Sequence, residues 1–155
     1  MATIPKVTLN TDLNEGFCFG CGQNNPIGMK LRFRISGETI RTEFTPHKMH
    51  QGWPGLVHGG ILYCLLDEVM SNMAYATGNT CVTANIEIRQ RQPVRVEVPL
   101  VITAWIIRHR KKVIETAGKI TLKDGTVIAE ATAKQFIADN QAEQGDKVKE
   151  TRRHV

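Results

Sequence analysis

One long apolar segment that carries two adjacent acidic residues constrains the fold of this chain more than any other feature. The segment runs from about Gly59 to Thr77, and its apolar residues surround most of a helix, which predicts burial on nearly all sides. Asp67 and Glu68 lie in its middle, and a buried carboxylate is costly unless it is paired or functional. Gly59 and Gly60 begin the helix, so backbone N–H groups are uncovered at the positive end of its dipole.

Alternating apolar and polar residues on both sides of this helix predict strands. The expected strands span residues 29–35, 39–44, 81–92, 99–108, 112–122 and 126–138. Asp124 and Gly125 predict a tight hairpin before the last strand, and hairpin links among the last four strands predict an antiparallel sheet. One sheet can curl around such a helix but covers only part of it. We therefore expect an α+β fold, a curled antiparallel sheet around one long central helix, with a second copy of the chain on the uncovered side.

Composition predicts a single globular domain with polar ends. The chain has 155 residues, 41% of them hydrophobic and 23% charged. We expect a flexible arm over residues 1–16, the domain over residues 17–138 and a polar tail over residues 139–155. No run approaches the roughly 18 apolar residues of a membrane span. The first residues do not resemble a signal peptide, so we expect a cytoplasmic location and no membrane partner.

The net charge of +5 favours an anionic ligand, such as a cofactor that carries phosphates. The basic residues lie on predicted strands with few aromatic residues beside them, and no helix-turn-helix or finger pattern is present. We therefore do not expect a nucleic-acid partner.

Gly59 and Asp67 have the residue types of an acyl-transfer site but are eight residues apart, or about 12 Å along one helix. One small carbonyl group cannot touch both. An antiparallel pair of these helices about a two-fold axis would bring Gly59 of one chain near Asp67 of the other. The Gly59 N–H would then hold a developing oxyanion, and Asp67 would act as general base or as nucleophile. This arrangement predicts two equivalent sites in a homodimer.

The sequence around the helix start also resembles a known family. Residues 51–60 read Gln-Gly-Trp-Pro-Gly-Leu-Val-His-Gly-Gly, and an acid follows nine residues after the His. This pattern is similar to the hotdog-fold acyl-CoA thioesterases, most closely the phenylacetic-acid-degradation type of the 4-hydroxybenzoyl-CoA thioesterase superfamily. The resemblance covers residues 17–138. It implies a dimer that often pairs again into a tetramer, and catalysis that requires no cofactor.

The resemblance also implies roles for single residues. Gly59 would supply the oxyanion N–H, and Asp67 would be the catalytic acid of the opposite chain. Many relatives carry an Asn that places the catalytic water where this chain offers Gln51. His58 is included in the catalytic group, although we expect it to hydrogen-bond to backbone and shape the loop rather than to transfer protons.

Two further helix residues are assigned to the substrate-binding site. Gly60 lies beside the proposed oxyanion N–H. Glu68 follows Asp67, and adjacent helix residues point about 100° apart, so only one of the two acids is expected to reach the reacting group. For Glu68 the alternative is a structural role, as the partner of an arginine or of a neighbouring loop.

Basic residues at two places are candidates to bind the nucleotide phosphates of coenzyme A. Arg89 lies on the strand predicted over residues 81–92, and Arg108, Arg110 and Lys111 belong to a compact basic hairpin between the next two predicted strands. A solvated strand edge that its charges protect from aggregation explains them equally well.

Four residues before the helix could hold a metal. Cys18 and Cys21 form a Cys-x-x-Cys pair, and His47 and His50 form a His-x-x-His pair. Together they would offer four tetrahedral zinc ligands. A CxxCG-x-x-NPxG segment like the one here resembles that of a subgroup of thioesterase-like proteins. The alternative is that the cysteines are turn residues and that the histidines belong to the surface or a substrate loop.

Two functions follow from these expectations. The first is hydrolysis of an acyl-CoA thioester with a small or medium acyl group, aromatic groups included. The alternative is a hotdog module that binds or senses acyl-CoA without cleaving it.

Overall fold

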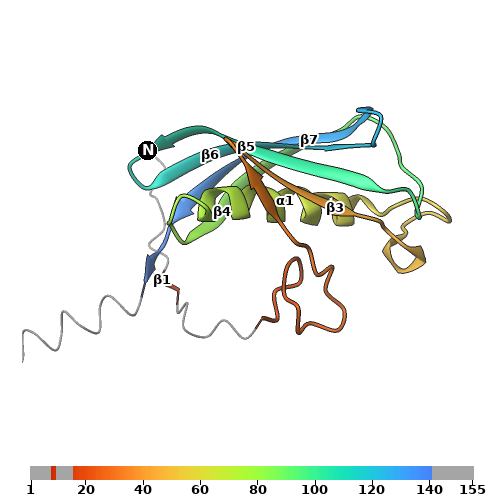
Figure 1. Ribbon diagram of the computed structural model, residues 1–155, viewed down its shortest axis with the longest axis horizontal. Helices are drawn as coiled ribbons and strands as arrows, with labels where there is room; N and C mark the ends of the chain where they lie inside the picture. The colour runs from red at the N-terminus through yellow and green to blue at the C-terminus, as the bar shows by residue number, and fades with distance from the viewer. Residues whose placement is uncertain (1–7, 10–15, 141–155) are drawn as a thin grey trace, which may run out of the picture.

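A six-stranded antiparallel sheet and one helix form the centre of the fold (Figure 1). The computed structural model describes residues 8–9 and 16–140. Its elements are β1 (Thr8–Leu9), β2 (Arg34–Ser36), β3 (Thr39–Phe44), the short 3-10 helix η2 (Lys48–His50), α1 (Gly59–Tyr75), β4 (Cys81–Gln90), β5 (Leu100–Arg110), β6 (Val113–Thr121), β7 (Val127–Ile137) and β8 (Asp139–Asn140). The strand order in the sheet is β2-β3-β5-β6-β7-β4.

Helix α1 lies against one face of the sheet, which bends over it (Figure 1). Its side chains Leu65, Leu66, Val69 and Met70 are fully buried and form the middle of the core. Gly118 of β6 permits the close approach, because a Cβ at this position would lie 3.1 Å from the Met70 side chain. The predicted α+β fold, with a curled antiparallel sheet around one central helix, is confirmed.

The sheet leaves one side of α1 without cover. Tyr63 is 46% exposed and Tyr75 63% exposed, whereas the side chains that face the sheet are buried. The segment 16–33 covers another part of the helix and lies on the side away from the sheet (Figure 1). Within the described residues no helix is long and apolar enough to cross a membrane.

The predicted hairpin order is correct for β5, β6 and β7 but wrong for β4. Strand β4 pairs with β7, the last strand of the sheet, and forms one of its two edges. The connection from β4 to β5 instead bonds to the loop before the helix, where the Val57 N–H donates to the Val94 carbonyl and Leu56 bridges to Arg95. These bonds draw the chain away from a hairpin.

The predicted strand over residues 29–35 is reduced to β2, which has three residues. The Met29 and Leu31 N–H groups donate to the carbonyls of Phe19 and Gly20 at 2.8 and 2.9 Å. Lys30 between them has a φ of 54°, outside the range of a strand. The upstream loop therefore takes the backbone bonds that a longer strand would have used.

The described ends of the domain form a small second sheet, in which Thr8–Leu9 pairs in parallel with Asp139–Asn140. The rest of the predicted arm before residue 16, and the predicted tail after residue 140, lie outside the described residues.

Candidate functional site

Asp67 is half-buried on the uncovered side of α1 and is held there by strand β4. The Thr83 hydroxyl donates to Asp67 Oδ1 at 2.7 Å, and Ser71 Oγ lies 3.2 Å from the same hydroxyl. Ser71 is one helical turn after Asp67, so the three side chains form a short polar network between α1 and the sheet edge. The network fixes one carboxylate oxygen of Asp67 and leaves the other without a partner in the described chain.

Thr83 was not identified by the sequence analysis. It lies beside an irregularity in the pairing of β4 with β7, where the register shifts between Thr83 and Asn85. Such a bulge re-aims a strand side chain and is frequent next to active sites. The available signal was a hydroxyl residue among the apolar residues of a predicted strand, which alone is too common to mark a site.

A buried amide lies across the sheet from Thr83. Gln135 is the cross-strand neighbour of Thr83 and has no exposed surface. Its Oε1 accepts from Thr116 at 3.2 Å, and its Nε2 has no hydrogen-bond partner among the described residues. A buried donor without a hydrogen-bond partner lowers stability, so this amide is a costly point in the interior next to the sheet edge.

The start of α1 leaves one N–H group uncovered. His58 is the N-cap, and its Nδ1 accepts from the Gly60 N–H at 2.8 Å. The Ile61 N–H donates to the His58 carbonyl at 3.0 Å. The Gly59 N–H makes no hydrogen bond within the part of the chain that the structure describes. A Cβ on Gly59 would lie 2.8 Å from Gln90 Nε2, which puts the end of β4 directly beside this N–H.

His58 and Gln51 both shape the loop that leads into the helix. Because His58 Nδ1 accepts a backbone bond, the neutral ring carries its proton on Nε2. Gln51 Oε1 accepts from the Gly55 N–H at 3.1 Å, and Gln51 bridges to Val57 across the same turn. These contacts account for both residues as parts of the loop. Gly60 is exposed, and its N–H is occupied by the cap.

The two halves of the candidate site lie at opposite ends of strand β4. Asp67 bonds to Thr83 near its beginning, whereas Gly59 lies against Gln90 at its end. Thr83 and Gln90 are seven residues apart, or about 23 Å along a strand. One chain therefore does not bring Gly59 and Asp67 to the same reacting group.

Glu68 points away from Asp67 and contacts the upstream loop. Its carboxylate oxygens lie 3.5 and 3.7 Å from Cys18 Sγ, and its Oε1 accepts from Asn72 at 3.2 Å. A Cβ on Gly20 would lie 2.4 Å from the Glu68 carboxylate carbon. These contacts place Glu68 as the partner of a neighbouring loop, the structural alternative considered for it.

Only two of the four predicted zinc ligands come together. Cys18 and Cys21 lie with Glu68, and neither histidine belongs to this group. His47 and His50 bond to each other's backbone at the ends of η2, where the His47 N–H donates to His50 Nδ1 at 3.0 Å. The predicted Cys2His2 set is therefore wrong for this chain, because the His-x-x-His spacing is used to cap a 3-10 turn.

Cys64 lies on α1 one turn before Glu68. Burial raises the pKa of its thiol to about 11, with smaller contributions from the charges of Glu68 and Asp67. A raised pKa favours the protonated thiol at neutral pH, as expected for a cysteine that packs in the interior.

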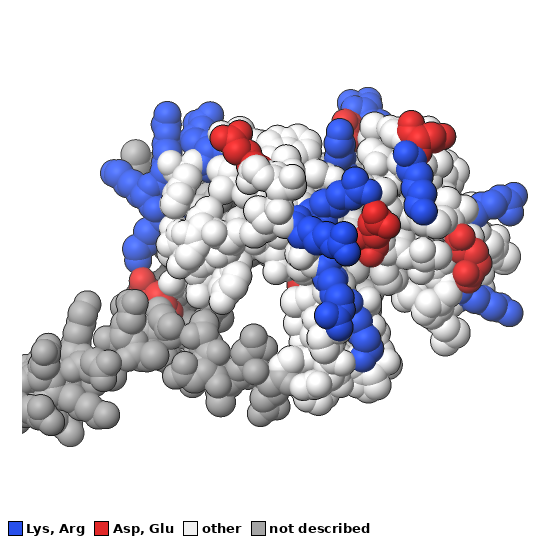
Figure 2. Space-filling view, viewed as in Figure 1, with Lys and Arg blue, Asp and Glu red and all other residues white. Residues whose placement is uncertain are grey.

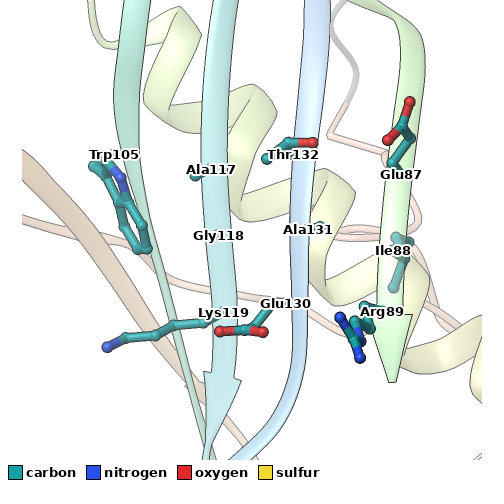
Figure 3. Close-up of a pocket in the computed structure, with 10 residues that line it drawn as sticks. All are labelled: Glu87, Ile88, Arg89, Trp105, Ala117, Gly118, Lys119, Glu130, Ala131 and Thr132. Carbon is teal, nitrogen blue, oxygen red and sulfur yellow. The ribbon is translucent and has the colours of Figure 1, made fainter. Parts of the chain in front are cut away.

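Arg89 lies on the face of the sheet opposite α1, in a pocket of about 480 Å³ (Figure 3). Figure 3 shows its side chain in one row with those of Glu130 and Lys119, as the strand register requires. Neither Asp67 nor Gly59 lines this pocket. It is thus a surface feature of the sheet and not the site that the helix forms.

The predicted basic hairpin lies at the other end of the sheet from Arg89. The strand register places Arg110 in one row across the sheet with Val113, Phe136 and Val82. Val82 is seven residues before Arg89 on β4, or about 23 Å along the strand. Arg108 also approaches Glu115 at 3.9 Å. Arg89 and the hairpin of Arg108, Arg110 and Lys111 therefore cannot hold the same phosphates within one chain.

A second basic surface was not identified from the sequence. Figure 2 shows Lys and Arg side chains gathered over β2 and the segment that leads into it. A surface pocket lies there, and the residues that line it include Lys30, Arg32, Arg34, Arg41 and the acidic Glu43. The signal in the sequence was the alternation of basic residues at positions 30, 32 and 34.

Comparisons with known proteins agree with the fold. The thioesterase superfamily model matches residues 54–129, which include Gly59, Asp67 and Thr83. A comparison with curated proteins finds no match. The chain is a hotdog-fold protein whose central segment matches the thioesterase superfamily.

Three solved structures illustrate the likeness. A thioesterase superfamily protein is 29% identical with a TM-score of 0.69, over 75% of this chain and 60% of the other. A phenylacetic acid degradation-related protein from Ralstonia eutropha JMP134 is 23% identical with a TM-score of 0.65, over 70% of this chain and 86% of the other. A hypothetical thioesterase with coenzyme A from Streptococcus pneumoniae TIGR4 is 17% identical with a TM-score of 0.67, over 70% of this chain and 89% of the other.

The capping geometry of His58 makes a testable prediction. Replacing His58 by Ala removes the acceptor of the Gly60 N–H and should lower the free energy of unfolding by about 1 kcal/mol. His58→Asn, which keeps a capping acceptor, should retain most of that stability. The measurement is the urea midpoint of the three proteins, with thioester hydrolysis recorded alongside. An unchanged midpoint for His58→Ala would contradict the capping role, and loss of hydrolysis in a stable His58→Asn would show a direct part in the chemistry.

Proposed function

We propose that this protein hydrolyses the thioester bond of acyl-CoA molecules, at sites formed between two copies of the chain. The observation that carries the proposal is the pair of groups described above. Asp67 is held by Thr83 on the uncovered side of α1, and the Gly59 N–H is unpaired among the described residues. The match to the thioesterase superfamily and the coenzyme A of the Streptococcus pneumoniae relative support the substrate class.

The free edge of β4 supports an antiparallel dimer. Strand β4 has a neighbour on one side only within the described sheet, and an edge strand offers its backbone groups to another chain. Antiparallel pairing of two β4 edges, centred near Ile86 and Glu87, would place Thr83 of one chain opposite Gln90 of the other. Asp67 is hydrogen-bonded to Thr83, and Gly59 lies beside Gln90, so each residue would move into place with its neighbour on β4. The two halves of the site would meet twice in the dimer.

The chemistry follows from these positions. The Gly59 N–H would donate to the thioester carbonyl oxygen and stabilise the negative charge that develops on it. Asp67 of the other chain would take a proton from the water that attacks the carbonyl carbon. It would then return the proton to the departing thiolate of coenzyme A. Direct attack by Asp67 on the carbonyl carbon would expel the coenzyme A thiolate and form an acyl anhydride. A single turnover in ¹⁸O-water separates the routes: general-base hydrolysis labels only the product acid, whereas attack of water on the aspartyl carbonyl of the anhydride labels the Asp67 carboxylate.

A small or medium acyl group, aromatic groups included, is the acyl class that we propose. Tyr63 lies one turn before Asp67 on the same face and is 46% exposed, so its ring is available as an apolar wall. In the proposed dimer, Arg89 of one chain would lie at the same end of the joined sheet as the basic hairpin of the other. Those residues together would then be in position for the nucleotide phosphates.

Replacing Asp67 by Asn tests the proposal directly. The variant keeps the shape of the side chain but cannot accept a proton, so we expect kcat to fall about 10²–10⁴-fold with the dimer and acyl-CoA binding intact. The measurement is thiol release from a panel of short, medium and aromatic acyl-CoAs. Asp124→Asn, an exposed acid in the turn between β6 and β7, is the matched control and should hydrolyse like wild type.

Two results would overturn the proposal. Equal hydrolysis by Asp67→Asn and wild type would remove Asp67 from the reaction. Tight acyl-CoA binding by wild type without thiol release from any substrate would establish a binding or sensing module instead.

Replacing Gly59 by Pro tests the oxyanion role, because proline lacks the N–H that the proposal requires. The backbone at this position suits proline: Gly59 is the first helical residue, and His58 has the φ of −65° and ψ of 135° that proline favours in the residue before it. The added Cβ would lie 2.8 Å from Gln90 Nε2, so the flexible end of that side chain has to shift. We expect kcat to fall about 10²–10³-fold at nearly unchanged stability. Gly59→Ala, which adds a Cβ at the same place but keeps the N–H, is the matched control. Hydrolysis by Gly59→Pro at the wild-type rate would exclude the Gly59 N–H as the stabilising group.

A further inference from the structure

The loop that carries the two cysteines closes around the Glu68 side chain. Figure 1 shows the segment 16–33 on the side of α1 away from the sheet. The Sγ atoms of Cys18 and Cys21 and a carboxylate oxygen of Glu68 all lie within 4.8 Å of one another. We propose that Cys18, Cys21 and Glu68 bind one zinc ion, with water in the fourth position, and that this ion fastens the loop to α1.

The spacing of the ligand atoms fits a tetrahedral zinc site. With Zn–S and Zn–O bonds of about 2.3 and 2.0 Å, tetrahedral angles separate sulfur from oxygen by about 3.5 Å. Cys18 Sγ lies 3.5 Å from Glu68 Oε1 and 3.7 Å from Oε2. The thiolate and carboxylate ligand types favour zinc among the common divalent ions. The Cys18–Glu68 pair therefore already has the separation of two zinc ligands, and Cys21 Sγ lies within 4.8 Å of both.

The backbone of the loop is built closely around this cluster. Gly20 is buried, and a Cβ there would lie 2.4 Å from the Glu68 carboxylate carbon. A Cβ on Gly22 would lie 2.4 Å from the Cys18 nitrogen, and the Gly22 N–H donates to the Cys18 carbonyl at 2.9 Å. The glycines let the turn bring both sulfurs to the carboxylate. This close approach is what a loop folded around an ion requires.

The Glu68 carboxylate is oriented by its own helix. Asn72, one turn later, donates from Nδ2 to Glu68 Oε1 at 3.2 Å and to the Glu68 carbonyl at 2.9 Å. A hydrogen bond of this kind from outside the ligand set orients a ligand and adjusts the metal affinity. None of the ion pairs among the described residues involves Glu68.

Zinc binding would use the thiolate form of both cysteines. On binding, the hydrated ion would gain two Zn–S bonds and one Zn–O bond. The two thiol protons and the displaced waters would go to solvent. No oxidant or reductant takes part, and no step of the proposed hydrolysis is involved.

The test measures metal on the full-length chain, reduced with a phosphine and purified without chelator. We expect one zinc per chain by elemental analysis. The metal-free chain titrated with CoCl₂ should develop the intense visible bands of tetrahedral cobalt and a near-ultraviolet thiolate band. Absence of bound zinc together with a weak octahedral cobalt spectrum would overturn the proposal. These readouts record no hydrolysis, so their failure would leave the proposed thioesterase function standing.

Variants assign the ligands. Titration with ZnCl₂ against a chromophoric chelator should show zinc affinity more than about 100-fold weaker for Glu68→Gln, and loss of the site for Cys18→Ser. Cys81→Ser is the matched control, because Cys81 is half-buried at the start of β4 and belongs to no such cluster among the described residues. Wild-type affinity in Glu68→Gln, or equal loss in Cys81→Ser and Cys18→Ser, would overturn the assignment. If Cys18→Ser does not fold, Glu68→Gln and the wild-type cobalt spectrum still decide.

Discussion

The burial of α1 is the constraint on which the rest of this structure depends. The helix has apolar side chains around most of its surface, and hydrophobic burial is the main stabilising force available to a domain of this size. The sheet covers the side of Leu65, Leu66, Val69 and Met70. The cysteine loop covers a second side at Glu68. The third side, with Tyr63 and Asp67, is left to a second copy in our account.

The two adjacent acids show how one helix serves two different environments. Neighbouring helix residues point about 100° apart, so Asp67 turns toward β4 and Thr83 while Glu68 turns toward Cys18 and Cys21. The proposed chemistry uses only the first of these directions. The proposed metal would use only the second, and it would hold in place the loop that borders α1.

Local patterns made the central element predictable. The helix was expected over residues 59–77 and is observed over Gly59–Tyr75, because its apolar periodicity, its glycine start and its stop before Gly78 all lie within the segment. The tight turn at Asp124 and Gly125 was predicted for the same reason: the Thr126 N–H donates to Asp124 Oδ1, and Gly125 has a φ of 90°. Asp67 could be selected over Glu68 as the candidate acid from its register with the family motif.

Contacts between distant segments were not predictable in this way. The pairing of β4 with β7, the Thr83 bond to Asp67 and the place of Glu68 beside the cysteines each depend on how separate segments pack. The histidine pair shows the difficulty most clearly. Its spacing suits a metal, but His47 and His50 bond to each other's backbone in a short 3-10 turn. Spacing along the chain fixes which residues can share a turn, and it does not fix which turns share a site.

The central claim is that Gly59 of one chain and Asp67 of the other act on the same thioester. The most direct measurement is the activity of purified heterodimers that contain one Asp67→Asn chain and one Gly59→Pro chain, coexpressed with different tags. Each homodimer of these variants lacks a complete site, whereas the heterodimer would contain one intact site and one doubly substituted site. We predict that it recovers about half of the wild-type activity per dimer. A heterodimer as inactive as its parents would contradict the shared site, as would a wild-type chain that hydrolyses acyl-CoA as a monomer.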